Sequence, residues 1–200
     1  LAVFGYPISP LRNETIEGSW TGPTQWFERD RLEDHSNEGK GVLAGRLGAR
    51  FLELRGTPWQ PGNDGPRPGY ALCTKFDQTG YNVCAPFSYY WQNNGGLERF
   101  GYPITPAFEE TIEGRTYLVQ YFERRRMEYH PENAGTPYDI LLGLLGRDVF
   151  PQCFELRDGP LQLAINRYKP TLGCPSENAR DTLPAVVQQF EHGWMIWLGP

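Results

Sequence analysis

The chain lacks long apolar runs and lacks an excess of positive charge, with 19 Lys and Arg against 24 Asp and Glu residues. No stretch approaches the roughly 20 apolar residues that a membrane-spanning helix requires, so we expect no membrane span. A net charge of −5 and a pI near 5.3, with no basic stripe, argue against nucleic-acid binding. The sequence also lacks Cys-x-x-Cys pairs, a Gly-x-Ser-x-Gly elbow and a phosphate-binding glycine loop. We therefore predict neither a metal site nor a cofactor.

Glycine, proline and aromatic residues are abundant. The 200 residues include 23 Gly and 18 Pro, and 14% are aromatic, whereas apolar residues make up only 39%. This balance is typical of many short strands joined by turns, with aromatic side chains supplying the core. We predict an all-β chain of short antiparallel hairpins and meanders, with one or two short helices and a propeller-like arrangement as one option.

The chain contains an internal repeat. Phe4–Ser9 returns as Phe100–Thr105, Glu14–Gly18 as Glu110–Gly114, and Gln25–Arg29 as Gln120–Arg124. The offsets are 96, 96 and 95 residues. Repeated units seldom bury their own apolar faces and stack on their neighbours. A repeated motif also argues against an enzyme, because an active site needs its catalytic group once.

A weaker third copy and a connector complete the organisation. Leu172–Ser176 and Gln188–Trp197 match the first and last elements of the repeat. The Pro/Gly-rich stretch 57–69 predicts an extended connector between a first module (1–56) and a second module with the partial third copy (70–200). Phe87–Leu97 precedes the second copy and nothing similar precedes Leu1, so we expect a piece of a longer polypeptide.

Local patterns predict the elements of each repeat. Glu113-Gly114 separates two β-prone runs, Phe108–Ile112 and Thr116–Phe122, and indicates a hairpin. A second turn near Arg124-Arg125 followed by Met127–His130 gives a three-stranded meander. The turn position holds Asp30, Arg125 or Gly193 in the three copies, which suggests a positive φ that Arg125 fits less well. Short helices are predicted over Phe87–Gln92, with a glycine C-cap, and over Tyr138–Leu145.

The four cysteines indicate disulfides and an oxidising compartment. Four cysteines allow three pairings, of which we prefer Cys73–Cys84 and Cys153–Cys174. Four buried, reduced thiols in a cytosolic protein are the alternative.

The repeated strand ends suggest a ligand surface. Phe27, Phe122 and Phe190 are unchanged and predict a core position, whereas the preceding residue varies among Trp26, Tyr121 and Gln189. An aromatic ring beside a carboxylate can bind the apolar face and the hydroxyls of a sugar. The hypothetical contact residues are Trp26, Glu28, Tyr121, Glu123, Glu191 and Trp194. The structural alternative, favoured for the glutamates, is that each carboxylate accepts backbone N–H groups of the adjacent turn. For Trp26 and Tyr121 the alternative that the rings pack between the repeated units is as well supported as a place at the rim of a groove.

Paired carboxylates could also indicate glycoside hydrolysis. Glu109-Glu110 with Glu14 or Glu17 would be the candidates. Because Glu14 and Glu17 recur as Glu110 and Glu113 inside expected hairpins, solvated strand and turn positions explain them better. We therefore predict no enzyme activity and no catalytic residue.

Several short elements in fixed order resemble the LGFP repeat of bacterial cell-envelope proteins. They are Trp91–Pro103, Glu113-Gly114, Gln120–Glu123 and Met127–Tyr129. The segments Leu172–Pro175 and Gln189–Gly193 match the residues of the repeat's core motif most closely. Phe replaces Leu in the first motif of two copies, and the match covers about two-thirds of the chain. The resemblance implies a non-catalytic tail that attaches a secreted protein to the cell wall or to polysaccharide.

These observations together predict an extracellular or cell-surface module. Its expected function is to bind peptidoglycan or another polysaccharide and to anchor a larger secreted protein. The alternative is a structural subunit or spacer whose exposed edges pair with other chains, including copies of itself, in a filament or surface layer. An enzyme domain is a third, weaker alternative.

Overall fold

The computed structural model describes residues 3–65, 72–150, 180–182, 185–191 and 193–198. The chain divides into two compact units, Leu1–Phe150 and Pro151–Pro200. Described strands pair antiparallel throughout, the four α-helices are short, and the described sheets form no closed barrel. The all-β prediction is therefore confirmed. No helix in the described ranges has the length and apolar character needed to cross a bilayer.

The first repeat folds into a four-stranded meander. Strands β1 (Arg12–Ile16), β2 (Trp20–Trp26), β3 (Arg31–Asp34) and β4 (Val42–Ala44) are hydrogen-bonded in sequence order. Glu17 and Gly18 both have positive φ, 51° and 68°, in a three-residue loop that Ser19 completes, because Ile16 pairs with Trp20. A 3₁₀ turn, η1 (Ser36–Glu38), connects β3 to β4, and helix α1 (Leu47–Leu54) follows.

The second repeat copies this arrangement. Strands β7 (Phe108–Ile112), β8 (Arg115–Tyr121), β9 (Arg126–Tyr129) and β10 (Ile140–Leu142) form the sheet β10-β9-β8-β7. The turn Glu113-Gly114 repeats the positive φ values, 49° and 81°. The 3₁₀ turn η2 (Pro131–Asn133) and helix α4 (Leu145–Val149) match η1 and α1. The predicted hairpin and the strand after Arg125 are thus confirmed.

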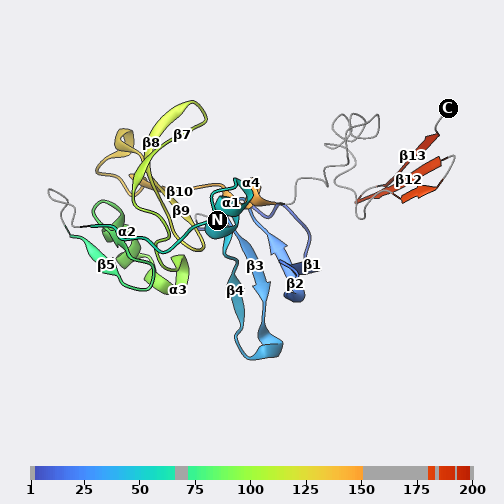
Figure 1. The fold of residues 1–200 in the computed structure, drawn as a ribbon, viewed down its shortest axis with the longest axis horizontal. Coiled ribbons are helices and arrows are strands. Elements are labelled where there is room, and N and C mark those ends of the chain that lie inside the picture. The colour runs from blue at the N-terminus through green and yellow to red at the C-terminus, as the bar shows by residue number, and fades with distance from the viewer. Residues whose placement is uncertain (1–2, 66–71, 151–179, 183–184, 192, 199–200) are drawn as a thin grey trace. The chain divides into compact units, whose positions relative to one another are not determined.

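The two repeats are joined by a reciprocal exchange of helices. The Ala49 N–H of α1 donates to the Glu123 carbonyl, and the Arg147 N–H of α4 donates to the Glu28 carbonyl, both at 3.1 Å. Helix α1 thus docks on the β8–β9 turn of the second repeat, and α4 docks on the β2–β3 turn of the first repeat. Figure 1 shows α1 and α4 between the two sheets. Blades of a propeller would instead contact side by side.

An apolar core fills the space between the two repeats. It combines Trp26, Val119 and Tyr121 from the strands with Leu47, Leu52, Leu145 and Val149 from the exchanged helices. A second core lies on the opposite face of the second sheet alone, where Phe122, Met127, Ile140 and Leu142 pack against Val83, Phe87 and Phe100. The last three residues of β8, Val119–Tyr121, are therefore buried on both faces.

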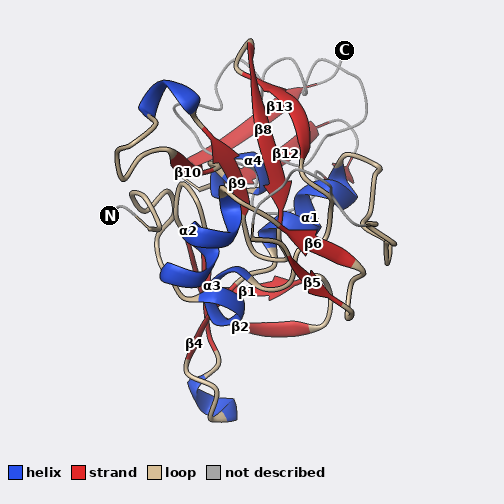
Figure 2. Cartoon of the chain, turned by 90° about the vertical axis from the view of Figure 1, so that its left-hand side faces the viewer, coloured by secondary structure: helices blue, strands red, loops and turns tan. Residues whose placement is uncertain are grey.

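The segment before the second repeat forms a cap over that second core. It consists of the hairpin β5 (Thr74–Phe76) and β6 (Tyr81–Val83) with helices α2 (Phe87–Asn93) and α3 (Gly96–Phe100). Figure 2 shows α2 and α3 beside each other. The predicted disulfide Cys73–Cys84 closes the hairpin, and the connector docks on it through Gly62 N–H to Thr79 O at 2.8 Å. The proposed partner bond, Cys153–Cys174, lies outside the described residues.

Two helix predictions had different outcomes. The helix expected over Phe87–Gln92 is confirmed as α2. The helix expected over Tyr138–Leu145 is wrong, because Ile140–Leu142 pairs with β9 as a fourth strand and α4 begins at Leu145. Pairing with β9 buries Ile140 and Leu142 in the second core, which outweighs a weak local helix pattern. The meander was predicted with three strands in each repeat, but this added strand makes each sheet four-stranded.

The positive φ expected at the turn position of Asp30 and Arg125 is also wrong. Among described non-glycine residues, positive φ occurs at Glu17, Leu72 and Glu113. The turn instead closes through one equivalent hydrogen bond in each repeat, with Phe27 N–H to Asp30 O and Phe122 N–H to Arg125 O at 2.7 Å. A four-residue turn needs no left-handed residue at its last position.

The third copy contributes a separate small sheet. Strands β11 (Arg180–Thr182), β12 (Ala185–Phe190) and β13 (Gly193–Leu198) form an antiparallel meander. Phe190 pairs with Gly193, which is the turn expected from the match to Gln120–Tyr129.

Candidate functional site

Two cavities meet in the second repeat and share an ion pair. The charged pocket, about 600 Å³, lies between β7, β9, β10 and the helices α1 and α4. The aromatic pocket, about 490 Å³, lies between the C-terminal end of α1, the connector and the second repeat. Arg55 and Glu110 line both cavities, and Arg55 donates to Glu110.

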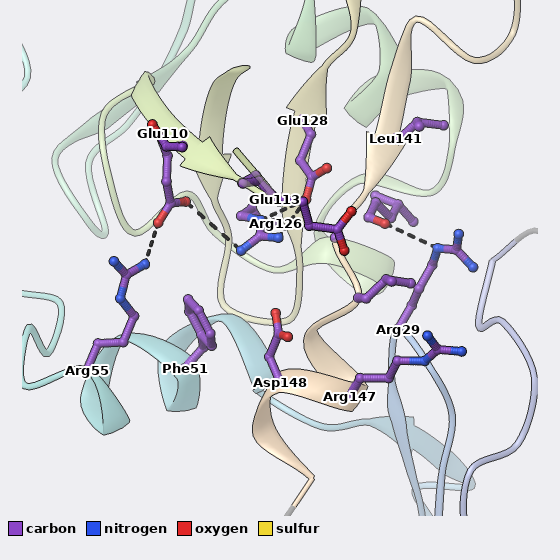
Figure 3. Close-up of a pocket in the computed structure, with 15 residues that line it drawn as sticks. Arg29, Phe51, Arg55, Glu110, Glu113, Arg126, Glu128, Leu141, Arg147 and Asp148 are labelled. Atoms are coloured by element: carbon purple, nitrogen blue, oxygen red, sulfur yellow. Dashed lines mark hydrogen bonds and ion pairs between the residues drawn. The ribbon is translucent and has the colours of Figure 1, made fainter. Parts of the chain in front are cut away.

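The charged pocket alternates guanidinium and carboxylate groups (Figure 3). Arg126 donates from Nε to Glu128 at 2.8 Å and from Nη1 to the Tyr121 hydroxyl at 3.2 Å. Glu110 accepts the Tyr121 hydroxyl at 2.8 Å. Burial raises the pKa of Tyr121 to about 12, so this phenol stays protonated and keeps donating at neutral pH. These bonds fix the positions of the charges at the pocket wall.

Asp148 stands apart from this network. It extends from α4 into the charged pocket, toward Arg126, in Figure 3. Among the described residues, no hydrogen bond or ion pair reaches its carboxylate. Desolvation raises the pKa of Asp148, with repulsion from Glu128, Glu110 and Glu113 adding to the effect and Arg126 opposing it. This carboxylate can therefore accept hydrogen bonds from a ligand.

The aromatic pocket presents rings beside polar groups. Trp59 and Tyr81 are half-buried and Phe108 is 37% exposed, all three lining the cavity. The Tyr81 hydroxyl donates to the Gln60 carbonyl at 2.9 Å, which fixes the ring against the connector. Thr105, Gln60 and the Arg55–Glu110 pair supply polar atoms at the same cavity. The combination suits a ligand with both apolar C–H faces and hydroxyl groups.

Trp26 and Tyr121 do not lie at a groove rim. Their exposed fractions are 2% and 0%, so the rim position is wrong and the alternative, that these rings pack between the repeated units, is confirmed. Trp26 Nε1 donates to Glu14 at 2.9 Å, which matches the bond from Tyr121 to Glu110 in the other repeat. The exchanged helices cover this face of the strand and bury both rings in the inter-repeat core.

Glu28 and Glu123 brace the repeated turns. Glu28 accepts the Tyr6 N–H and Glu123 accepts the Tyr102 N–H, both at 3.1 Å. The Tyr6 hydrogen bond is the main cause that lowers the pKa of Glu28. Each carboxylate also pairs with an arginine from the start of the other repeat's helix, Arg147 for Glu28 and Arg46 for Glu123. This is the structural alternative that the sequence favoured.

The remaining predicted contact residues belong to the third copy. Glu191 is exposed at the turn between β12 and β13. The backbone of Trp194 pairs with Gln189, but its side chain lies outside the described residues. Two of the carboxylates considered for catalysis have different ion-pair partners, Arg12 for Glu14 and Arg55 for Glu110.

Sequence reasoning missed most residues of the two pockets. Trp59 was assigned to an extended connector, and Arg55 and Asp148 fell outside the recognised motifs. One signal could have found the helices that carry Arg55 and Asp148. Gly45–Gly48 returns as Gly143–Gly146, with Leu-Gly at the end of each. This further repeated element places a glycine at each exchanged helix.

Comparisons with known proteins give no family. No protein-family model matches the chain, and no similar sequence was found among curated proteins.

Proposed function

We propose that this chain is a non-catalytic module that binds cell-wall or another polysaccharide and anchors a larger secreted protein. The observation that carries the proposal is the aromatic pocket joined to the charged pocket at the Arg55–Glu110 pair. Pyranose rings present an apolar C–H face and a rim of hydroxyls, which these two surfaces complement. The Cys73–Cys84 disulfide is compatible with a secreted protein.

Each half of the site has a distinct task in this proposal. Phe108 and Trp59 contact the apolar face of a sugar unit, while Arg55 donates to its hydroxyls. Asp148 accepts hydroxyl groups of a neighbouring sugar unit in the charged pocket. Because the Arg126 and Glu110 groups are already fixed by hydrogen bonds, little ordering is required when a ligand binds.

A pull-down on insoluble peptidoglycan, chitin and cellulose, with soluble sugar as competitor, tests the proposal. Retention that a soluble fragment reverses is the expected result. The double variant Trp59→Ala, Phe108→Ala should reduce affinity by at least about tenfold, on the order of 1.4 kcal/mol, without loss of the β-sheet circular dichroism signal.

Tyr138→Ala is the matched control, because Tyr138 is an aromatic residue 64% exposed that lines neither pocket. Its affinity should equal that of the parent chain. Absence of retention on all three polymers would overturn the proposed function. Equal losses in the double variant and in Tyr138→Ala would overturn the assignment to these pockets.

A further inference from the structure

The charged pocket holds two carboxylates that stand outside its ion-pair network. Its lining includes four arginines and four acidic residues, so its formal charge is balanced. Among the described residues, however, neither Glu113 nor Asp148 makes an ion pair. Figure 3 shows Asp148 on α4 and Glu113 at the turn between β7 and β8. Both residues are exposed, so a ligand that enters the pocket can reach them.

The arginines of the pocket are held by other partners. One of these partners, Glu28, does not itself line the pocket, so it draws positive charge away from the cavity. The contacts are the ion pairs Arg55–Glu110, Arg126–Glu128 and Arg147–Glu28, and the hydrogen bond from Arg29 Nε to the Leu142 carbonyl at 3.1 Å. The wall around Asp148 and Glu113 is therefore locally richer in negative charge than the formal count indicates.

The surroundings of Asp148 reflect this local charge. Desolvation is the main cause that raises the pKa of Asp148, and three neighbouring carboxylates add to the shift whereas Arg126 opposes it. A neutral ligand that fills the pocket removes more water from Asp148 and Glu113 without supplying an opposite charge. Carboxylates that lose water are costly unless they are paired. A cationic group on the ligand offsets this cost.

The first repeat does not share this feature. Glu17 stands at the position of Glu113, and its carboxylate lies 3.8 Å from Nη2 of Arg31. Arg50 stands at the position of Asp148 and forms an ion pair within α1. The same two positions are thus paired in the first repeat and carry two unpaired carboxylates in the second. This difference assigns the negative charge to the charged pocket and not to the repeat in general.

We propose, on the basis of the function proposed above, that the charged pocket prefers a sugar unit with a protonated primary amine, which Asp148 and Glu113 bind. A primary ammonium group combines a positive charge with three N–H donors, so it can donate to more than one carboxylate oxygen. A deacetylated amino sugar places this group on the ring where a neutral sugar has a hydroxyl. The adjoining sugar unit occupies the aromatic pocket, because the two cavities share the Arg55–Glu110 pair.

Two short oligosaccharides test this preference. Calorimetry compares fully N-acetylated chitotetraose with the same tetrasaccharide carrying one free amine, at a pH below the pKa of that amine. The chain should bind the amine-bearing form at least about tenfold more tightly, as expected for hydrogen bonds between charged groups. In the double variant Glu113→Gln, Asp148→Asn this ratio should fall to about one, because the amides retain the side-chain size but lose the charge.

Glu98→Gln is the matched control, since Glu98 is an exposed acidic residue that lines neither pocket. This variant should keep the tenfold ratio. A loss equal to that of the double variant would show general attraction to a chain of net charge −5 and would overturn the proposal. Retention of the ratio in the double variant would overturn the assignment to Asp148 and Glu113.

The remaining outcomes separate this inference from the proposed function. Equal affinity for the two tetrasaccharides, or no binding of the amine-bearing form, overturns the amine preference. The proposed function is judged independently by retention on the three insoluble polymers. Nα-acetyl-lysine amide serves as a competitor that carries a primary ammonium but no sugar. Competition as strong as that of the amine-bearing tetrasaccharide would overturn the amino sugar as the source of the ammonium group.

Discussion

Asp30 and Arg125 occupy the same position of the two repeats and contact each other. Asp30 is fully buried, Arg125 is 1% exposed, and the Arg125 guanidinium donates to the Asp30 carboxylate. Burial lowers the pKa of Arg125 and raises the pKa of Asp30 to about 6 against an ordinary 3.8, although the ion pair opposes both shifts. Desolvation exceeds the attraction because both charges leave water.

This titration predicts a specific pH dependence of stability. Because folding raises the pKa of Asp30, the folded state binds this proton more tightly than the unfolded state. The carboxyl's contribution to the free energy of unfolding is complete below about pH 3.8 and declines as the pH rises through about 6. Asp30→Asn should lack that decline. Urea unfolding between pH 4 and 7.5 measures it.

Asp34→Asn is the control for Asp30→Asn. Hydrogen bonds from Ser36 lower the pKa of Asp34, so that residue contributes stability that is lost as the pH falls. Its removal should change the profile with the opposite sign and only below about pH 3.8, so unfolding of this variant is also followed to about pH 3. An unchanged pH profile in Asp30→Asn would contradict the assignment of the decline to this residue.

At the scale of elements, the exchanged helices depend on close backbone contact. A Cβ on Gly48 of α1 would lie 1.9 Å from the Phe122 carbonyl oxygen, and one on Gly146 of α4 would lie 1.8 Å from the Phe27 carbonyl oxygen. Such distances require the helix or the turn to move. The repeated Leu-Gly element therefore serves the docking of each helix on the other repeat.

Gly48→Ala should destabilise the chain. Alanine ordinarily stabilises a helix by about 1 kcal/mol relative to glycine, but the steric conflict with a carbonyl should dominate and give a net loss of about 1–3 kcal/mol. Chemical denaturation followed by tryptophan fluorescence measures this loss. Gly65→Ala is the control, since among the described residues no atom outside Gly65 and its chain neighbours lies within 4 Å of its Cβ position. Equal stability of the two variants would contradict the close-contact explanation.

The first unit as a whole has an approximate two-fold relation between its repeats. Residue 30 meets its own equivalent, residue 125, and each helix docks on the other repeat's turn. In a two-fold contact between identical units, the residue at this position would meet itself. Identical charges would repel there, so Asp in one copy and Arg in the other make the pair attractive.

Exchanging the two side chains tests this relation. Asp30→Arg or Arg125→Asp alone places two like charges in a buried contact and should cost roughly 3–5 kcal/mol. The double variant restores an opposite pair at equivalent positions and should recover most of that loss. Unfolding free energies of all four chains form the double-mutant cycle. A double variant as unstable as the sum of the single variants would argue against equivalence of the two positions.

The sequence alone determined the repeat, the hairpin turns and the Cys73–Cys84 loop. These features depend on residues close in the chain, such as Glu113-Gly114 with its positive φ values. The unchanged phenylalanine of the three copies also identified Phe122 as a core position. Even the bracing role of Glu28 and Glu123 was open to sequence reasoning, because it involves a turn and its own repeat.

The tertiary structure decided what covers each face. Alternation shows which residues share a face but not whether a distant segment packs on it. The sequence therefore left Tyr121 open between a groove rim and packing between the repeats, and α1 and α4 bury it between the repeats. Arg55, Trp59 and Asp148 converge on the pockets from α1, the connector and α4, which are far apart in the sequence. Their proximity follows from helix exchange between the repeats, a long-range contact that no local pattern encodes.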